Sequence, residues 1–277
     1  MVITRGSILR EVLIEKEDLM YRYSKFRAGL TALEGYEQIF EDLKKTCELL
    51  RGMIRNADER EHEEDLMKFA RENRFSDDAV LETFSQWVDV DYITDYLIAQ
   101  TLFCNYDIKN QSYWATDDYA IRWRPVFYDI DRCFTDNSSR SNLFDGYFSK
   151  KGVVYDQAAG RVANMDLYAH LRDNAAWCDR FVHRYAELLT TEFSVERLQS
   201  LLDEMAATLR PEMAQHIALY GKPASMEEWE GYIASMRAEI ALRHAAIQKQ
   251  IRSQFHLSEV QWEEILREAS RKDAGDP

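Results

Sequence analysis

The 277-residue chain has few of the residues that crosslink or interrupt a fold, with 4 cysteines, 4 prolines and 10 glycines. The cysteines are scattered and form no Cys-x-x-Cys pair, which argues against a zinc knuckle or a redox dithiol and favours buried free thiols. Low proline and glycine contents, with 46% apolar residues, exclude a disordered or fibrous protein. We therefore expect a globular fold.

Long apolar runs and an excess of positive charge are also missing. No run approaches the roughly 18 residues of a membrane-spanning helix, and the N-terminus lacks the apolar core of a signal peptide, so we expect a cytoplasmic chain without a membrane span. Lys and Arg total 35 against 49 Asp and Glu, which gives a net charge of −14. This charge opposes binding to nucleic acid, and we expect no nucleic-acid partner.

Most of the chain shows the three- and four-residue apolar spacing of amphipathic helices. One such stripe occupies residues 36–50. Ser76 and Asp91 are suited to be the N-caps of two further helices, the second of which leads to Cys104. After residue 131 the pattern predicts helices only.

Local signals mark the ends of the later helices. Pro211 interrupts an apolar stripe and is expected to kink or end its helix. Ser225 with Glu228, and Ser258 with Gln261, have the spacing of capping boxes and predict the starts of two further helices.

Residues 105–131 differ from the helical remainder by being polar and rich in aromatic side chains. Gln111 to Ala115 and Ile121 to Phe127 favour β-structure, and the Thr-Asp-Asp sequence at 116–118 is typical of a turn. We predict a β-hairpin here, so the expected fold class is mainly α with a small β-hairpin.

The same stretch carries the residues best suited to chemistry, namely Asp107, Asn110, Asp129 and Asp131. Residues two apart on a strand share a face, so Asp129 and Asp131 are expected to lie together and to repel each other unless a cation or proton neutralises them. Oxygen ligands of this kind suit Mg²⁺ or Mn²⁺, together with substrate phosphates. The pattern therefore indicates metal-dependent phosphate chemistry.

Two other interpretations of these carboxylates remain open. In the first, Asp107 caps a turn, and the other two are ordinary solvated or ion-paired carboxylates near the arginines of this stretch (Arg122, Arg124 and Arg132). In the second, Asp129-Ile130-Asp131 is the Asp-x-Asp metal site of a glycosyltransferase that uses Mn²⁺ and a nucleotide sugar.

Residues 88–134 resemble the core of the CotH family, the kinase-like proteins related to spore coat protein H. They contain an Asp-Tyr-Leu helix, the Asn-Tyr-Asp loop at 105–107 followed by Asn110, and a strand that ends in Tyr-Asp-Ile-Asp at 128–131. The helical residues 181–217, the late Trp229 and the Gln-Ile-Arg-Ser-Gln-Phe run at 250–255 also resemble the family.

The resemblance implies an α+β, protein-kinase-like fold that binds ATP and Mg²⁺, with Mn²⁺ as a substitute, and phosphorylates Ser or Thr of a protein substrate of the spore-coat kind. By position, Asp107 would orient the substrate hydroxyl. Asn110 and Asp129 would contact the metal and nucleotide, and Asp131 would be a second metal ligand.

The comparison also suggests how the chain is organised. Residues 1–35 are expected to be a hinge or a remnant of an N-terminal lobe, because no Gly-rich strand-loop-strand segment is found there. Residues 36–270 would form the helical C-terminal lobe with the hairpin, and residues 271–277 a flexible tail. A chain lacking the N-terminal lobe could instead be a non-catalytic, pseudokinase-like coat or assembly protein, and this alternative also remains open.

Overall fold

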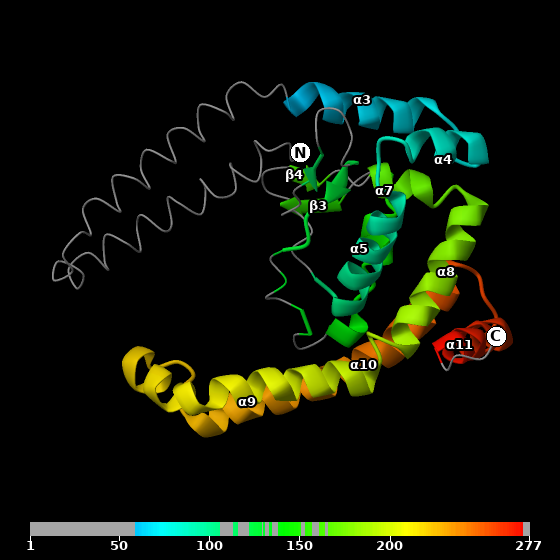
Figure 1. Ribbon diagram of the computed structural model, residues 1–277. Helices are drawn as coiled ribbons and strands as arrows, with labels where there is room; N and C mark the ends of the chain where they lie inside the picture. Colours follow the sequence, from blue (N-terminus) through cyan, green and yellow to red (C-terminus); the bar gives the residue numbers. More distant parts are fainter. Residues whose placement is uncertain are drawn as a thin grey trace, which may run out of the picture. The chain divides into compact units, whose positions relative to one another are not determined.

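A computed structural model describes residues 59–105, 113–115, 122–128, 130, 133–134, 138–150, 153–156, 161–163 and 166–273 (Figure 1). The chain forms two compact units. Of the described residues, the first unit contains 59–74, 79–93, 113–115 and 122–127, and the second contains the others. The helix predicted at 36–50 and the remnant predicted at 1–35 lie outside the described residues, so the predicted domain boundaries stay a prediction.

The first unit packs aromatic side chains of α3 (Glu59–Glu72) and α4 (Asp78–Phe84). The Phe69 ring lies 6.2 Å from the Phe84 ring and 5.1 Å from the Trp87 ring, measured between centroids. Phe84 is fully buried. Such ring pairs contribute beyond their buried area, so this cluster stabilises the described part of the unit.

The predicted hairpin is confirmed as an antiparallel pair in the first unit. β1 (Tyr113–Trp114) pairs with β2 (Arg124–Pro125), with Tyr113 opposite Pro125 and Trp114 opposite Arg124. Of the described residues in the predicted strands, Ala115, Arg122, Val126 and Phe127 lie outside β1 and β2, and the predicted turn lies outside the described residues.

Helix α5 (Val90–Phe103) begins in the first unit and ends in the second. Asp89 caps it, because the Tyr92 backbone N–H donates to Asp89 Oδ1 at 3.2 Å. The prediction that Asp91 is the cap is wrong: Asp91 lies inside the first turn. Asp89 and Asp91 both match the sequence pattern of an N-cap. The structure identifies Asp89 as the cap, because the helix begins at Val90.

The second unit is built mainly of helices. α8 (Ala175–Thr190) packs against α11 (Glu259–Asp273), and α9 (Val195–Tyr220) lies along α10 (Met226–Gln254), as Figure 1 shows. Shorter elements are the 3₁₀ helix η1 (Ser138–Arg140), α6 (Phe144–Tyr147) and α7 (Asp166–Leu171). Its core is a set of contacting aromatic rings (Phe144, Phe148, Trp177, Phe181, Tyr185 and Phe255). The predicted mainly helical class is confirmed.

One prediction for this unit is wrong, and one of the two alternatives given for Pro211 is excluded. The structure has a second antiparallel hairpin, β3 (Val153–Asp156) with β4 (Arg161–Ala163), where helices alone were expected after residue 131. The β-branched and aromatic run Val153 to Tyr155 is its sequence signal. Pro211 also does not end its helix, since α9 continues through it to Tyr220.

Both predicted helix starts are confirmed, and the second is a complete capping box, whereas in the first the Glu228 carboxylate accepts from the Ala224 N–H and not from the Ser225 N–H. Ser225 Oγ accepts from the Glu228 N–H at 3.1 Å, and Ser258 Oγ accepts from the Gln261 N–H at 3.2 Å. The second box is reciprocal, because the Ser258 N–H donates to Gln261 Oε1 at 2.9 Å. Helices α10 and α11 therefore start at serines whose hydroxyl oxygens accept hydrogen bonds from backbone N–H groups of the first helical turn.

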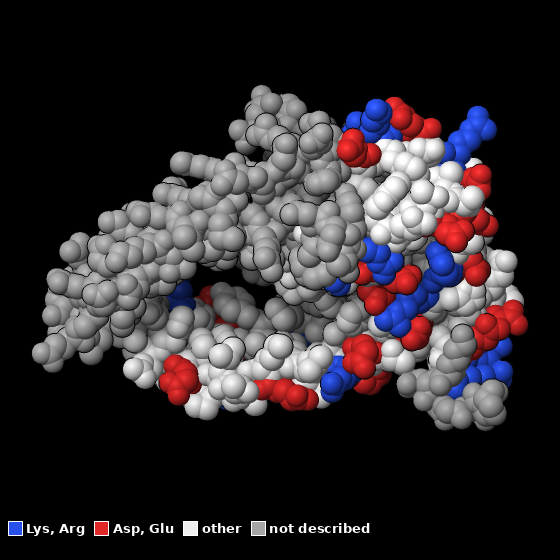
Figure 2. Space-filling model, turned by 45° about the horizontal axis from the view of Figure 1, so that its top comes forward, with Lys and Arg blue, Asp and Glu red and all other residues white. Residues whose placement is uncertain are grey.

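The described surface mixes charges of both signs. In the view of Figure 2, acidic and basic side chains alternate over the described residues. Among these residues, no helix is both long enough and apolar enough to cross a membrane.

Candidate functional site

All four predicted site residues, Asp107, Asn110, Asp129 and Asp131, lie outside the described residues. Their roles therefore stay predictions. What the structure describes is how some neighbouring segments are held. The segment before Asp107 and the segment after Asp131 belong to the second unit, whereas Asn110 belongs to the first.

The segment before Asp107 is the end of α5. Cys104 adopts a left-handed backbone conformation with φ 56°, and the Asn105 N–H donates to the Gln100 carbonyl at 3.2 Å. This is the six-to-one bond that ends a helix in the Schellman motif. A side chain other than glycine in that conformation costs about 1–3 kcal/mol. The backbone strain therefore lies directly before the Asn-Tyr-Asp loop.

The segment after Asp131 has a second left-handed residue, Phe134, with φ 49°. It follows a turn in which the Cys133 N–H donates to the Ile130 carbonyl at 3.1 Å. Residues held in this region persist only where their surroundings enforce it, and they concentrate at functional sites. Cys104 and Phe134 thus lie on the two sides of the stretch that contains the predicted acidic residues, and a third left-handed residue, His256 with φ 55°, follows α10.

The two strained segments contact each other. The Phe134 N–H donates to the Phe103 carbonyl at 3.2 Å, and the two rings lie 5.4 Å apart. Asp107 follows Phe103 by four positions, and Asp131 precedes Phe134 by three. The segment that precedes Asp107 and the segment that follows Asp131 are therefore in contact.

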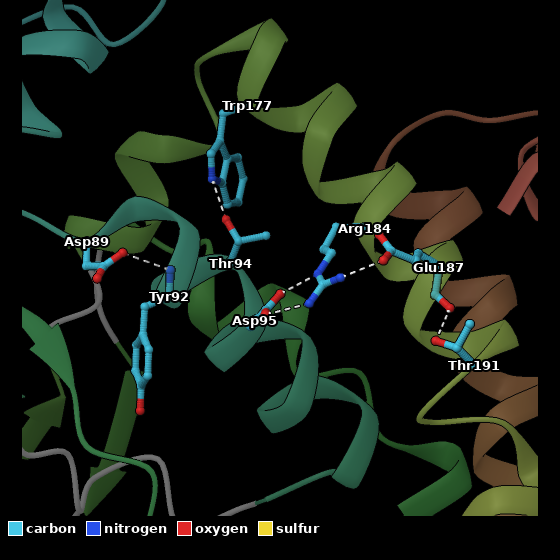
Figure 3. Close-up of polar contacts among 8 residues, drawn as sticks. All are labelled: Asp89, Tyr92, Thr94, Asp95, Trp177, Arg184, Glu187 and Thr191. Atoms are coloured by element: carbon cyan, nitrogen blue, oxygen red, sulfur yellow. Dashed lines mark hydrogen bonds and ion pairs between the residues drawn. The ribbon is translucent and has the colours of Figure 1, made fainter. Parts of the chain in front are cut away.

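Figure 3 shows two contacts that hold α5 to α8, at Thr94 and Asp95. Arg184 binds Asp95 through two hydrogen bonds of 2.8 Å, and this bonding raises the pKa of the guanidinium, so it stays charged. Trp177 Nε1 donates to Thr94 Oγ1 at 3.1 Å. Within the second unit, the helix that leads to the predicted catalytic loop is therefore fixed from one side.

Near the end of α5, the buried hydroxyls of Thr101 and Tyr185 lie 3.1 Å apart. Burial raises the pKa of Tyr185, which keeps its hydroxyl neutral and available as a donor. Tyr185 also donates to the Ile98 carbonyl at 3.3 Å. This pair anchors the last turns of α5 to α8.

The residue that sequence reasoning missed is Arg243 of α10, which is fully buried. Its guanidinium donates to four backbone carbonyls, those of Thr101, Leu102, Ser138 and Ser141. A signal was present, because Arg243 interrupts the buried apolar stripe of α10 formed by Ile240, Ile247 and Ile251. An arginine in such a stripe must be paired to be buried.

The arginines near the hairpin have partners in the first unit. Arg122 and Arg124 approach the Asp89 carboxylate at 3.5 and 3.8 Å, and the Arg124 guanidinium lies 5.2 Å from the centre of the Tyr92 ring. The alternative in which Asp129 and Asp131 are ordinary carboxylates near these arginines stays untested, because both aspartates lie outside the described residues. Arg132, which was also considered, is outside the described residues.

A metal centre is not formed by the described residues alone: none of their His, Cys, Asp and Glu side chains gather in a group of three or more that could hold an ion. The predicted ligands are elsewhere, at Asn110, Asp129 and Asp131. Their donors are carboxylate and amide oxygens, the chemistry that Mg²⁺ prefers.

Comparison with known proteins places the chain in a family. A family model described as CotH kinase protein matches residues 10–247. The chain belongs to the CotH kinase family. The resemblance seen in the sequence is confirmed, and family membership indicates a kinase-like protein with nucleotide and divalent-metal use as its general expectation. Neither the curated proteins nor the solved structures contain a match.

Proposed function

We propose that this CotH family member is an ATP- and Mg²⁺-dependent protein kinase that phosphorylates Ser or Thr of a protein substrate of the spore-coat kind. The observation that carries the proposal is the family match, which spans residues 10–247 and so includes every predicted site residue. In the same proposal, the helices of the second unit form the C-terminal lobe of a kinase-like fold, and the hydrogen bond between Phe134 and Phe103 supports a site where the two segments meet.

Each site residue has a chemical role in this proposal. Asp107 accepts a hydrogen bond from the substrate hydroxyl and takes its proton as the oxygen bonds to the γ-phosphorus, while the bond from that phosphorus to the β,γ-bridging oxygen breaks and ADP leaves. Asp129 and Asn110 are oxygen ligands for Mg²⁺, which when bound neutralises charge on the phosphates, and Mn²⁺ could replace it. Asp131 is the second carboxylate ligand. The surrounding contacts hold Cys104 and Phe134, on either side of these residues, in left-handed conformations.

Nucleotide binding is the first test. Calorimetric titration of the chain with ATP should show saturable binding in the presence of Mg²⁺ and weak or no binding without it. The Asp129→Ala variant should lose the Mg²⁺-dependent part, because it removes a metal ligand. Asp91→Ala, a change of an exposed carboxylate on α5, should bind as the wild type does.

Phosphoryl transfer is the second test. Transfer of labelled γ-phosphate to a Ser- and Thr-containing coat-type protein should fall by at least about a hundredfold in Asp107→Ala, because general-base catalysis typically contributes 10²–10⁴-fold. ATP affinity should change little, since Asp107 contacts the hydroxyl and not the nucleotide. Full transfer by Asp107→Ala would overturn this assignment.

The alternatives make different predictions for the same protein. A folded chain indifferent to ATP and Mg²⁺ would favour the non-catalytic, pseudokinase-like assembly protein. Binding of UDP or GDP with Mn²⁺, in place of ATP, would favour the Asp-x-Asp glycosyltransferase. The family match favours the kinase over both.

A further inference from the structure

Arg243 occupies an unusual place for a charged residue. It lies in the middle of α10 at 0% exposure, in the stripe that packs into the second unit. Burying a guanidinium without compensation is strongly unfavourable. The fold must therefore supply hydrogen-bond acceptors for the guanidinium, and these acceptors identify the chain segments that Arg243 joins.

Its acceptors come from two segments far from it in sequence. Nε donates to the Leu102 carbonyl at 3.0 Å and Nη2 donates to the Thr101 carbonyl, both in the last turn of α5. Nη1 donates to the Ser138 and Ser141 carbonyls at 3.1 and 2.7 Å. One planar group therefore joins the end of α5 to η1 and the residues after it.

The chemistry of both partners suits a guanidinium. The last four carbonyls of a helix lack intrahelical partners and carry the negative end of its dipole, so the end of α5 attracts a buried cation. Arginine offers five donors in a fixed plane, whereas lysine offers three donors on one flexible atom. Only arginine can reach both segments at once with this geometry.

Two further side chains of α10 hold the second segment alone. Glu239 Oε2 accepts from the buried Ser138 Oγ at 3.0 Å, and Gln250 Nε2 donates to the Ser141 carbonyl at 2.9 Å. Neither has a hydrogen bond to α5 among those described. They provide a natural comparison, because they share the second segment with Arg243 but not the first.

We propose that Arg243 is a positioning residue of the candidate site, which fixes the end of α5 relative to residues 138–141. The first of these segments leads into the loop with Asp107, and the second follows the segment with Asp129 and Asp131. The inference rests on the proposed function for the identity of the site, but the link between the two segments is a property of the fold. Arg243 acts through the backbone and touches neither substrate nor metal.

The test uses the full chain and three variants. Arg243→Lys keeps the positive charge and avoids the unfolding expected from Arg243→Ala. Gln250→Ala loosens only the second segment, and Ile247→Val removes one buried methyl group of α10 without touching either segment's carbonyls. Amide hydrogen exchange is followed by mass spectrometry in peptides covering 99–105 and 138–144, and Mn²⁺ affinity is measured by electron paramagnetic resonance with Asp129→Ala as the site control.

Positioning by Arg243 predicts a specific pattern. In Arg243→Lys, exchange should become about tenfold faster in both peptides, as the loss of a charge-assisted hydrogen bond implies. Gln250→Ala should accelerate exchange only in peptide 138–144. Ile247→Val should not accelerate exchange in either peptide more than in the rest of the unit. Mn²⁺ affinity should fall about tenfold in Arg243→Lys, the size of effect seen when groups that orient metal ligands are changed, and stay near wild type in Ile247→Val.

The opposite outcomes separate this inference from the proposed function. If the wild type binds Mn²⁺ through Asp129 and Arg243→Lys binds it equally well, the positioning role is wrong and the proposed site stands. If exchange in Arg243→Lys rises in one peptide only, the link between segments is wrong. If the wild type shows no Mn²⁺ binding that Asp129→Ala removes, the proposed site fails and the positioning role fails with it.

Discussion

At the scale of single residues, Asn174 shows how one side chain can join separate segments of the second unit. Its Oδ1 accepts from the Trp177 N–H at 2.7 Å, which caps α8. Its Nδ2 donates to the Phe75 carbonyl and to Asp78 Oδ1, both at 2.9 Å. The residue is fully buried, so water cannot replace these partners in the native state.

Removing this side chain should be costly. We expect Asn174→Ala to lower the free energy of unfolding by about 2–4 kcal/mol, the sum of a lost N-cap and of the lost buried hydrogen bonds that Nδ2 donates. Asn174→Asp keeps the cap but faces the Asp78 carboxylate, and it should also be destabilising. Urea unfolding followed by circular dichroism measures both changes.

The control for this prediction is Asn142→Ala. Asn142 also accepts from a backbone N–H at a helix start, that of Phe144 at 3.2 Å, but it is exposed. Its loss should cost roughly 1 kcal/mol or less, because water can satisfy the freed N–H. Equal effects of the Asn174 and Asn142 variants would show that burial does not decide the cost.

At the scale of elements, α9 tolerates a proline that local reasoning expected to interrupt it. Pro211 is exposed and lies inside a helix that runs from Val195 to Tyr220. The helix persists because α9 packs along α10 through a cluster that includes Ala206, Met213 and Trp229 on both sides of the proline. Tertiary packing here outweighs an unfavourable residue propensity.

This balance predicts that Pro211→Ala stabilises the protein. Alanine restores a backbone N–H donor inside the helix and removes the clash of the proline ring, a gain of up to about 3 kcal/mol. Urea unfolding should therefore shift to higher concentration. The neighbouring exposed change Glu212→Ala should stay within about 0.5 kcal/mol of the wild type, and a lower stability of Pro211→Ala would contradict the argument.

At the scale of the whole molecule, the main feature is the surplus of acidic residues. The net charge is −14, and such a surplus repels itself in the compact state. Local ion pairs, such as Arg184 with Asp95 and Arg210 with Glu230, act in the opposite direction. Both effects are screened by salt, so their balance can be measured.

We expect self-repulsion to dominate. Raising sodium chloride from 10 to 300 mM, with a chelator present, shortens the Debye length from about 30 Å to less than 10 Å. The melting temperature should then rise by a few degrees, since about 1 kcal/mol corresponds to roughly 2–4 °C for chains of this size. Differential scanning calorimetry measures the shift. A fall in melting temperature would show that local ion pairs outweigh the surplus charge.

Much of the helical fold could be predicted, and the reason is local. The apolar spacing of α8 and α10 and the capping boxes at Ser225 and Ser258 depend on residues within about one or two turns. The hairpin of β1 and β2 was predicted from aromatic and β-branched runs in the same way. For the candidate site, residue types and resemblance predict four residues that stay a prediction, and the structure describes how segments next to them are held.

The sequence by itself determined the helical class, the family and the positions of the candidate carboxylates, because periodicity, capping and motifs are properties of neighbouring residues. Only the tertiary structure decided that Arg243 is buried, because its acceptors at Thr101 and Ser138 lie more than a hundred positions away. It likewise decided that Phe134 contacts Phe103, and that α9 continues through Pro211. In each case the deciding energy comes from contacts between distant segments, which no local pattern contains.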